Sequence, residues 1–99
     1  MLKLHFKDSR QAPIWLVEER FTLGQDKRNN LVLADAGISA FHAEIRQDNG
    51  LYYISDCDSE LGTFVNDERI ASRYQLRSGD CLRLGEVELQ LTDPRSEER

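Results

Sequence analysis

The sequence has few cysteines and no long hydrophobic run. Cys57 and Cys81 are its only cysteines, too few for the disulfide framework of a small secreted domain. It has no stretch of about 18 apolar residues, so no transmembrane helix is expected. Residues 1–8 become charged within a few positions, unlike a secretory signal. The sequence therefore predicts a cytoplasmic protein with reduced thiols and no membrane contact.

An excess of positive charge is also missing, since 18 acidic residues outnumber 13 basic ones and the net charge is −5. Nucleic-acid-binding domains carry a basic patch or stripe, so nucleic acid is not an expected partner. The histidines and cysteines lie at spacings unrelated to zinc motifs. We therefore expect no metal and no other cofactor.

Catalytic motifs are absent as well. Ser39 and His42 are close in sequence, but residues three apart on a strand point to opposite faces. The sequence has no elbow-like nucleophile motif and no glycine-rich loop before a helix. The chain is predicted not to be an enzyme.

Helical periodicity is hard to find in any window of eleven or more residues, whereas alternation of apolar and polar residues is common. It is clearest over residues 2–6 and 87–91. Further short runs are rich in β-branched, aromatic or leucine residues. These runs are 14–17, 20–23, 31–33, 42–46, 51–55, 63–65 and 81–84. The pattern predicts an all-β fold, a two-sheet antiparallel β-sandwich of about 10–11 short strands.

Turn residues separate these runs. Asn49-Gly50 is the strongest hairpin signal, because both central residues of a type I′ turn need positive φ. Gly85-Glu86 suits a type II′ turn, which places glycine first. Asn66-Asp67 is a further hairpin candidate, and Ser78-Gly79-Asp80 marks another reversal.

One domain is expected over residues 1–92, because 99 residues suffice for a single modest core. Residues 93–99 contain no apolar residue except Pro94, which is typical of a disordered tail or the start of a linker. Both alternatives stay open. The linker alternative implies further domains C-terminal to Arg99.

Several separated motifs occur in one order and spacing. They are Gly24-Gln25, Asn29-Asn30-Leu31, Ser39-Ala40-Phe41-His42-Ala43, Ser59 to Asp67, and Leu76-Arg77-Ser78-Gly79-Asp80. Together they cover about residues 2–92 and resemble the forkhead-associated (FHA) domain, a reader of phosphothreonine peptides. The resemblance implies an FHA/SMAD-like β-sandwich, an interaction module in signalling and, as our expectation, a bacterial source.

By resemblance, a framework of matching residues positions the site. Gly24 and Gly62 are expected in tight loop conformations. His42 is expected to hydrogen-bond the loop that carries the peptide site, and Asn66 to begin a hairpin. Thr63 retains the threonine of the peptide-site loop.

The ligand-facing positions depart from the family pattern. By resemblance, Gln25 replaces the Arg that contacts the phosphate, and Ala40 replaces the Arg or Asn that often follows Ser39. Leu61 replaces the Asn that grips the peptide backbone, and Glu60 replaces a small hydroxyl residue. Ser39 and nearby backbone amides are the phosphate donors that remain.

These replacements weaken phosphate binding. Losing a hydrogen bond to a charged group costs about 1.5–3 kcal/mol. A carboxylate about 5 Å from a phosphate charge repels it by roughly 3 kcal/mol at an effective dielectric of 20. After screening, a micromolar site would become about two orders of magnitude weaker, and hence millimolar.

The first function that the sequence leaves open is phosphate-independent interaction with a protein partner or with another copy of the chain. Exchanging polar for apolar character suits protein docking better than ion binding. The candidate apolar docking residues are Phe41, Leu61 and Phe64.

The alternative is a phosphothreonine reader with a phosphoprotein partner. Ser39 and backbone amides would then bind the phosphate together with Lys27 or Arg28, the candidate rescue cations that follow Gln25. Flexible surface cations contribute little unless they are preorganised, which favours the first function.

Overall fold

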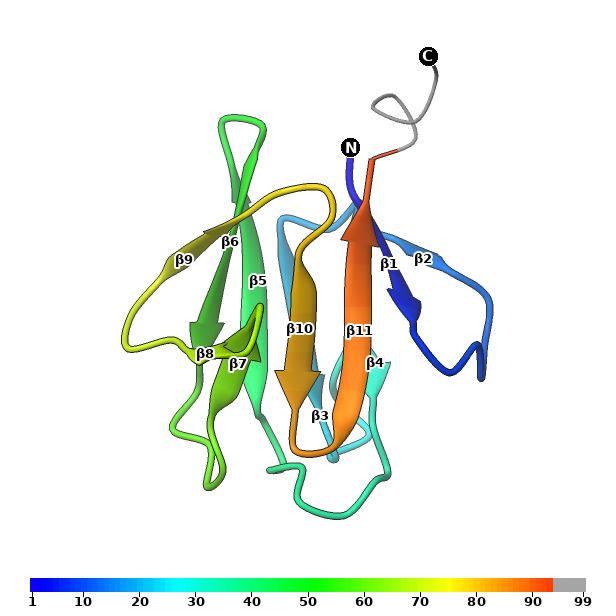
Figure 1. Ribbon diagram of the computed structural model, residues 1–99, viewed down its shortest axis with the longest axis vertical. Helices are drawn as coiled ribbons and strands as arrows, with labels where there is room; N and C mark the ends of the chain where they lie inside the picture. Colours follow the sequence, from blue (N-terminus) through cyan, green and yellow to red (C-terminus); the bar gives the residue numbers. More distant parts are fainter. Residues whose placement is uncertain (94–99) are drawn as a thin grey trace.

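The computed structural model describes residues 1–93, in which eleven strands form two sheets and no helix occurs (Figure 1). The strands are β1 (Lys3–Phe6), β2 (Ile14–Trp15), β3 (Arg20–Gly24), β4 (Leu31–Val32), β5 (Ala43–Asp48), β6 (Leu51–Asp56), β7 (Thr63–Val65), β8 (Glu68–Arg69), β9 (Tyr74–Leu76), β10 (Cys81–Leu84) and β11 (Val87–Thr92). The six-stranded sheet has the order β2-β1-β11-β10-β7-β8, and the five-stranded sheet has the order β4-β3-β5-β6-β9. The predicted all-β sandwich is confirmed.

One pair of strands departs from the antiparallel prediction. β4 runs parallel to β3, with Leu23 opposite Leu31. The loop between them folds back because the Thr22 N–H donates to Asn30 Oδ1 at 2.8 Å and the Asn30 N–H donates to Thr22 Oγ1 at 3.1 Å. These two bonds hold the end of the loop beside β3. The chain therefore enters β4 running in the same direction as β3.

The alternating residues of the first and last strands face the core. Leu4, Leu89 and Leu91 are completely buried, and β1 pairs with β11 so that Leu4 lies opposite Leu91. Burying one such side chain contributes about 1.5–3 kcal/mol. The period-two pattern therefore identified the inward face correctly.

The hairpin turns have the predicted backbone. Asn49 and Gly50 have φ of 52° and 81°, and Asn66 and Asp67 have φ of 51° and 70°, as type I′ turns require. At the β10–β11 turn Gly85 has φ of 60°, as the first position of a type II′ turn requires. β8 and β9 were not among the predicted runs; β8 has two residues, both charged, and β9 has three.

The loops that follow β3, β4 and β6 gather at one end of the sandwich with the β10–β11 turn, away from the end where the chain starts (Figure 1). A Cβ on Gly85 would lie 3.2 Å from Gly37 O, so the β10–β11 turn packs closely on the β4–β5 loop. The predicted site residues other than Phe64 and Asn66 fall at or next to this loop end, and Asn66 lies in the β7–β8 turn, bonded to Asp80 and Cys81.

Two further expectations concern the ends of the chain and the membrane. Apart from Asp93, the predicted tail or linker lies outside the described residues. The described strands end at Thr92, and the domain boundary at that position stays a prediction. Within residues 1–93 no helix is long and apolar enough to span a membrane.

Candidate functional site

Backbone hydrogen bonds join the β3–β4 and β4–β5 loops beside Gly24. The Gln25 N–H donates to Ser39 O at 2.9 Å, and the Asp26 N–H donates to Ala40 O at 3.0 Å. A Cβ on Gly24 would lie only 2.2 Å from Ala40 O. Glycine is needed here because the two backbone segments approach so closely.

His42 links the β4–β5 loop to the β6–β7 loop and is completely buried. The Ser39 N–H donates to His42 Nδ1 at 3.1 Å, so Nδ1 carries no proton. Nε2 then carries the proton and donates to Gly62 O at 2.9 Å. A third link runs from the Glu60 N–H to Ser39 Oγ at 3.1 Å. One neutral imidazole thus fixes both loops that border the site.

The expectation that Ser39 and His42 lie on opposite faces of a strand is wrong. β5 begins at Ala43, and both residues belong to the loop before it. Both imidazole nitrogens are bonded to backbone groups. Neither nitrogen is therefore available as a base for Ser39. This reason differs from the predicted one, that the two side chains point to opposite faces of a strand.

Asp56, at the end of β6, anchors the β6–β7 loop. Its carboxylate accepts hydrogen bonds from the hydroxyls of Ser59 and Thr63 and from the Ser59 N–H at 3.0 Å. Burial opposes ionisation of Asp56, but the hydrogen bonds from Ser59 and Thr63 outweigh it, and its pKa lies below the ordinary value. The Gly62 N–H completes the loop by donating to Ser59 Oγ at 2.9 Å.

Replacing Asp56 with asparagine is expected to destabilise the domain by about 1–3 kcal/mol at neutral pH, because an amide nitrogen would face a hydrogen-bond donor. The pKa of Asp56 is lowered on folding. Its stabilisation is thus complete above the unfolded value of about 3.9 and is lost as the pH falls through the folded value. Urea unfolding between pH 7 and pH 2 measures both effects. The exposed Asp58, replaced with asparagine, is the control that should change little; equal losses in both variants would contradict this role for Asp56.

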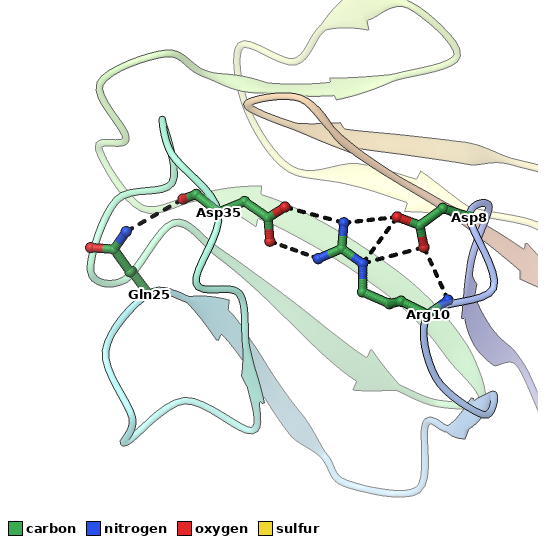
Figure 2. A network of polar contacts seen from close by, with 4 residues as sticks. All are labelled: Asp8, Arg10, Gln25 and Asp35. Carbon is green, nitrogen blue, oxygen red and sulfur yellow. Dashed lines mark hydrogen bonds and ion pairs between the residues drawn. The ribbon is translucent and has the colours of Figure 1, made fainter.

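The Gln25 side chain points toward the backbone of Asp35 (Figure 2). Its Nε2 donates to Asp35 O at 3.3 Å. Arg10, from the β1–β2 loop, donates to both carboxylate oxygens of Asp35 at 2.7 and 3.1 Å. The same guanidinium binds Asp8 at 2.8 Å, so the pKa of Asp8 lies below its ordinary value. The Gln25 side chain is the last member of this polar network.

A hollow of about 270 Å³ opens between the loops, and it brings together four of the predicted site residues: Gln25, Ser39, Glu60 and Leu61. Gly37 and Ile38 complete its lining. Ala40 lies beside it and contributes its backbone oxygen to Asp26. Thr63 is completely buried and its hydroxyl binds Asp56.

The two candidate rescue cations do not line the hollow. Arg28 donates to the two carboxylate oxygens of Asp26 at 2.9 and 3.1 Å, and this hydrogen bonding lowers the pKa of Asp26. Its guanidinium also lies 5.1 Å from the centre of the Phe41 ring. Lys27 is exposed on the same loop. Arg28 would have to break these contacts before it could reach a ligand in the hollow.

The three apolar docking candidates have different surroundings. Leu61 is 51% exposed at the edge of the hollow. Phe41 is 40% exposed and contacts Arg28. Phe64 lies on β7 in the six-stranded sheet, where the Arg83 guanidinium covers its ring at 4.1 Å. Leu61 is the candidate that belongs to the hollow itself.

Sequence reasoning missed three residues of the site. Asp56 accepts from the N–H of Ser59 three positions later, and such a local bond from an Asp side chain to the backbone is a signal that the sequence offers. Arg10 and Asp35 are 25 residues apart, and no local pattern indicates that they pair. Only the three-dimensional structure reveals that Arg10 fixes the segment to which Gln25 is bonded.

Comparison with known proteins agrees with this geometry. A model of the FHA domain matches residues 21–85. FhaA of Mycobacterium tuberculosis is 36% identical over 86 residues, which cover 87% of this chain and 16% of FhaA. The glycogen accumulation regulator GarA of Mycolicibacterium smegmatis is 34% identical over 76% of this chain and 48% of GarA.

A similar solved structure is EmbR of Mycobacterium tuberculosis in complex with a low-affinity phosphopeptide. It superposes with a TM-score of 0.87 at 31% identity, over 92% of this chain and 24% of EmbR. The chain thus spans less than half the length of each of these three relatives. The matched motifs, the sandwich and its loop end all agree, and the chain belongs to the FHA-domain family.

Proposed function

We propose that this FHA domain binds a protein partner, or a second copy of itself, through its loop end without recognising phosphothreonine. Related FHA domains engage in phosphothreonine-dependent interactions. The observation that carries our proposal is the lining of the hollow, where, among the described residues, Gln25 and Glu60 are present and no Lys or Arg is. Phosphate recognition in proteins depends on cations or on dense N–H donors.

Two of the nearby arginines support the proposal because each has other contacts. Arg28 is bound to Asp26, and Arg10 is bound to Asp8 and Asp35. Releasing either guanidinium would leave a carboxylate unpaired beside an incoming phosphate. Glu60 would add repulsion of roughly 3 kcal/mol per unit charge at about 5 Å and an effective dielectric of 20, before screening by salt.

The apolar edge of the hollow fits docking of a protein better than capture of an ion. Leu61 is 51% exposed beside the hollow, at the position where the family pattern has Asn. The buried core of a protein interface is more apolar than its rim, so an exposed leucine beside the hollow fits a contact with a protein. The proposal includes no catalytic role. The cytoplasmic location, the absence of nucleic-acid and membrane partners and any fusion to further domains stay predictions.

The alternative function, reading of phosphothreonine, rests on a smaller set of groups. Ser39 Oγ accepts a hydrogen bond from the Glu60 N–H, which leaves the hydroxyl proton to donate to a ligand. Lys27 is exposed and lies two residues after Gln25. Neither group is a cation held in place at the hollow.

Restoring the family residues should create the binding that the chain lacks. We expect a variant with Gln25→Arg, Glu60→Ser and Leu61→Asn to bind phosphothreonine peptides about two orders of magnitude more tightly than the natural chain, because it regains a cation and loses the repelling carboxylate. The probe is a peptide library with a central threonine, phosphorylated or not, and degenerate flanking positions. Calorimetry on the selected peptides measures the affinities.

The control is Lys27→Ala in the natural chain, which should leave the weak binding of phosphopeptides unchanged. Micromolar affinity of the natural chain for phosphorylated peptides, lost on Lys27→Ala, would contradict the proposal and establish the alternative.

A further inference from the structure

Two of the polar side chains that line the hollow, Gln25 and Glu60, present hydrogen-bond acceptors to a ligand. Asp35 O is itself an acceptor, so the Gln25 amide must direct Nε2 to it and Oε1 away from it (Figure 2). Ionised Glu60 offers two acceptor oxygens and no donor. Arg10 holds Asp35 at 2.7 and 3.1 Å and thereby keeps the Gln25 amide in this orientation. A ligand in the hollow is therefore expected to be rich in donors.

The lining of the hollow carries one negative charge, that of Glu60, and no Lys or Arg among the described residues. Glu60 makes no ion pair among the described residues, whose ion pairs belong to other side chains. In the neighbouring network, Asp8 and Asp35 outnumber Arg10. The net charge of −5 adds a long-range attraction for basic segments.

The edge of the hollow can hold an aliphatic chain. Leu61 is 51% exposed there, and the buried Ile38 also lines the hollow. Lysine and arginine carry long apolar stems that pack on such surfaces while their charged ends reach polar groups. A small inorganic cation would make no use of this apolar edge.

Acceptors, a carboxylate without an ion pair and an apolar edge together fit a single class of ligand. We propose that the hollow binds a lysine or arginine side chain of an unphosphorylated segment of the protein partner, with Glu60 as its counter-ion, Gln25 Oε1 as a second acceptor and Leu61 against its stem. This inference rests on the proposed function and names the chemistry of the partner. The site would then prefer a positively charged ligand, whereas the family pattern implies a negatively charged one.

The threonine-centred library tests this inference when the natural chain and Glu60→Gln select from it in parallel. We expect the unphosphorylated peptides chosen by the natural chain to share a Lys or Arg at one position. Their affinity should fall about ten-fold or more in Glu60→Gln, because a charge-assisted hydrogen bond is lost. The Glu60→Arg variant should instead select peptides that share an Asp or Glu at that position. Glu86→Gln is the matched control, because it removes the same charge from the exposed β10–β11 turn outside the hollow.

The outcomes separate this inference from the proposed function. Unphosphorylated peptides without a shared basic residue, or with equal affinity for the natural chain and Glu60→Gln, would overturn the inference and leave phosphate-independent binding intact. Selection of phosphorylated peptides alone would overturn both. A library that gives no binder in either form would also contradict the inference.

Discussion

Replacing Gly24 with alanine is expected to destabilise the domain by about 3 kcal/mol or more. The new Cβ would lie 2.2 Å from Ala40 O and 2.9 Å from Asn29 Nδ2. The clash is with backbone and cannot be relieved by a rotamer change. Moving the Ala40 carbonyl would break its hydrogen bonds from the Asp26 N–H and from Asn29 Nδ2 at 2.7 Å. For a domain of this size the melting temperature should fall by about 12 °C or more.

Gly79→Ala separates this clash from the general cost of replacing a glycine. Gly79 has φ of 96°, and a Cβ added to it would meet no atom within 4 Å beyond its chain neighbours. Alanine there suffers backbone strain alone, which costs about 1–2 kcal/mol. Denaturant unfolding of both variants compares the two effects. A loss for Gly24→Ala no larger than that for Gly79→Ala would contradict the close approach at Ala40.

Replacing His42 with alanine is expected to cost about 3–5 kcal/mol, because a cavity and unsatisfied backbone groups would remain. The imidazole is completely buried and accepts from the Ser39 N–H while it donates to Gly62 O. Both loops that border the hollow would lose their common link. Thermal unfolding measures the stability, and hydrogen exchange at Ser39 and Glu60 should show faster opening of the loops.

His5→Ala is the matched control for His42→Ala. His5 is half-buried on β1, where it pairs with Gln90 across the sheet. Its loss should change the free energy of unfolding by less than about 1 kcal/mol. If the two variants were equally stable, the structural link through His42 would be refuted.

Local rules predicted most of the fold from the sequence. The alternating strands follow from the pleat of a β-strand. The Asn-Gly, Asn-Asp and Gly-Glu turns follow from the φ values that hairpins need. Both rules depend only on neighbouring residues. The parallel β3–β4 pair was missed because it depends on the exchange of hydrogen bonds between Thr22 and Asn30. Such pairs leave no periodic signal.

The site was less predictable than the fold. Four of the six residues that line the hollow were named in advance through the resemblance, but their orientations were not. The outward-facing oxygen of Gln25 depends on Asp35, and Asp35 depends on Arg10 from a distant loop. Likewise, the placement of Ser39 and His42 in one loop depends on where β5 begins. Contacts between residues far apart in sequence set these orientations.

The residues that fix the loops of this domain differ from the residues that face a ligand. The ligand-facing residues can therefore change while the loop structure is kept. Gly24, His42 and Asp56 fix the loops through backbone and buried contacts. Gln25 and Glu60 face the hollow, so a change of charge at these positions leaves the framework bonds intact. The chain can therefore keep the FHA fold while its loop end takes a different ligand.

The most direct test of the central claim is an NMR titration of the natural chain with a phosphothreonine peptide and its unphosphorylated counterpart. We expect no saturable shift at Ser39 and Glu60 with the phosphorylated form below about 1 mM, since a site lacking its cation has at best millimolar affinity. Saturable shifts at both residues at micromolar concentration, seen with the phosphorylated peptide alone, would contradict the claim that this hollow no longer reads phosphothreonine.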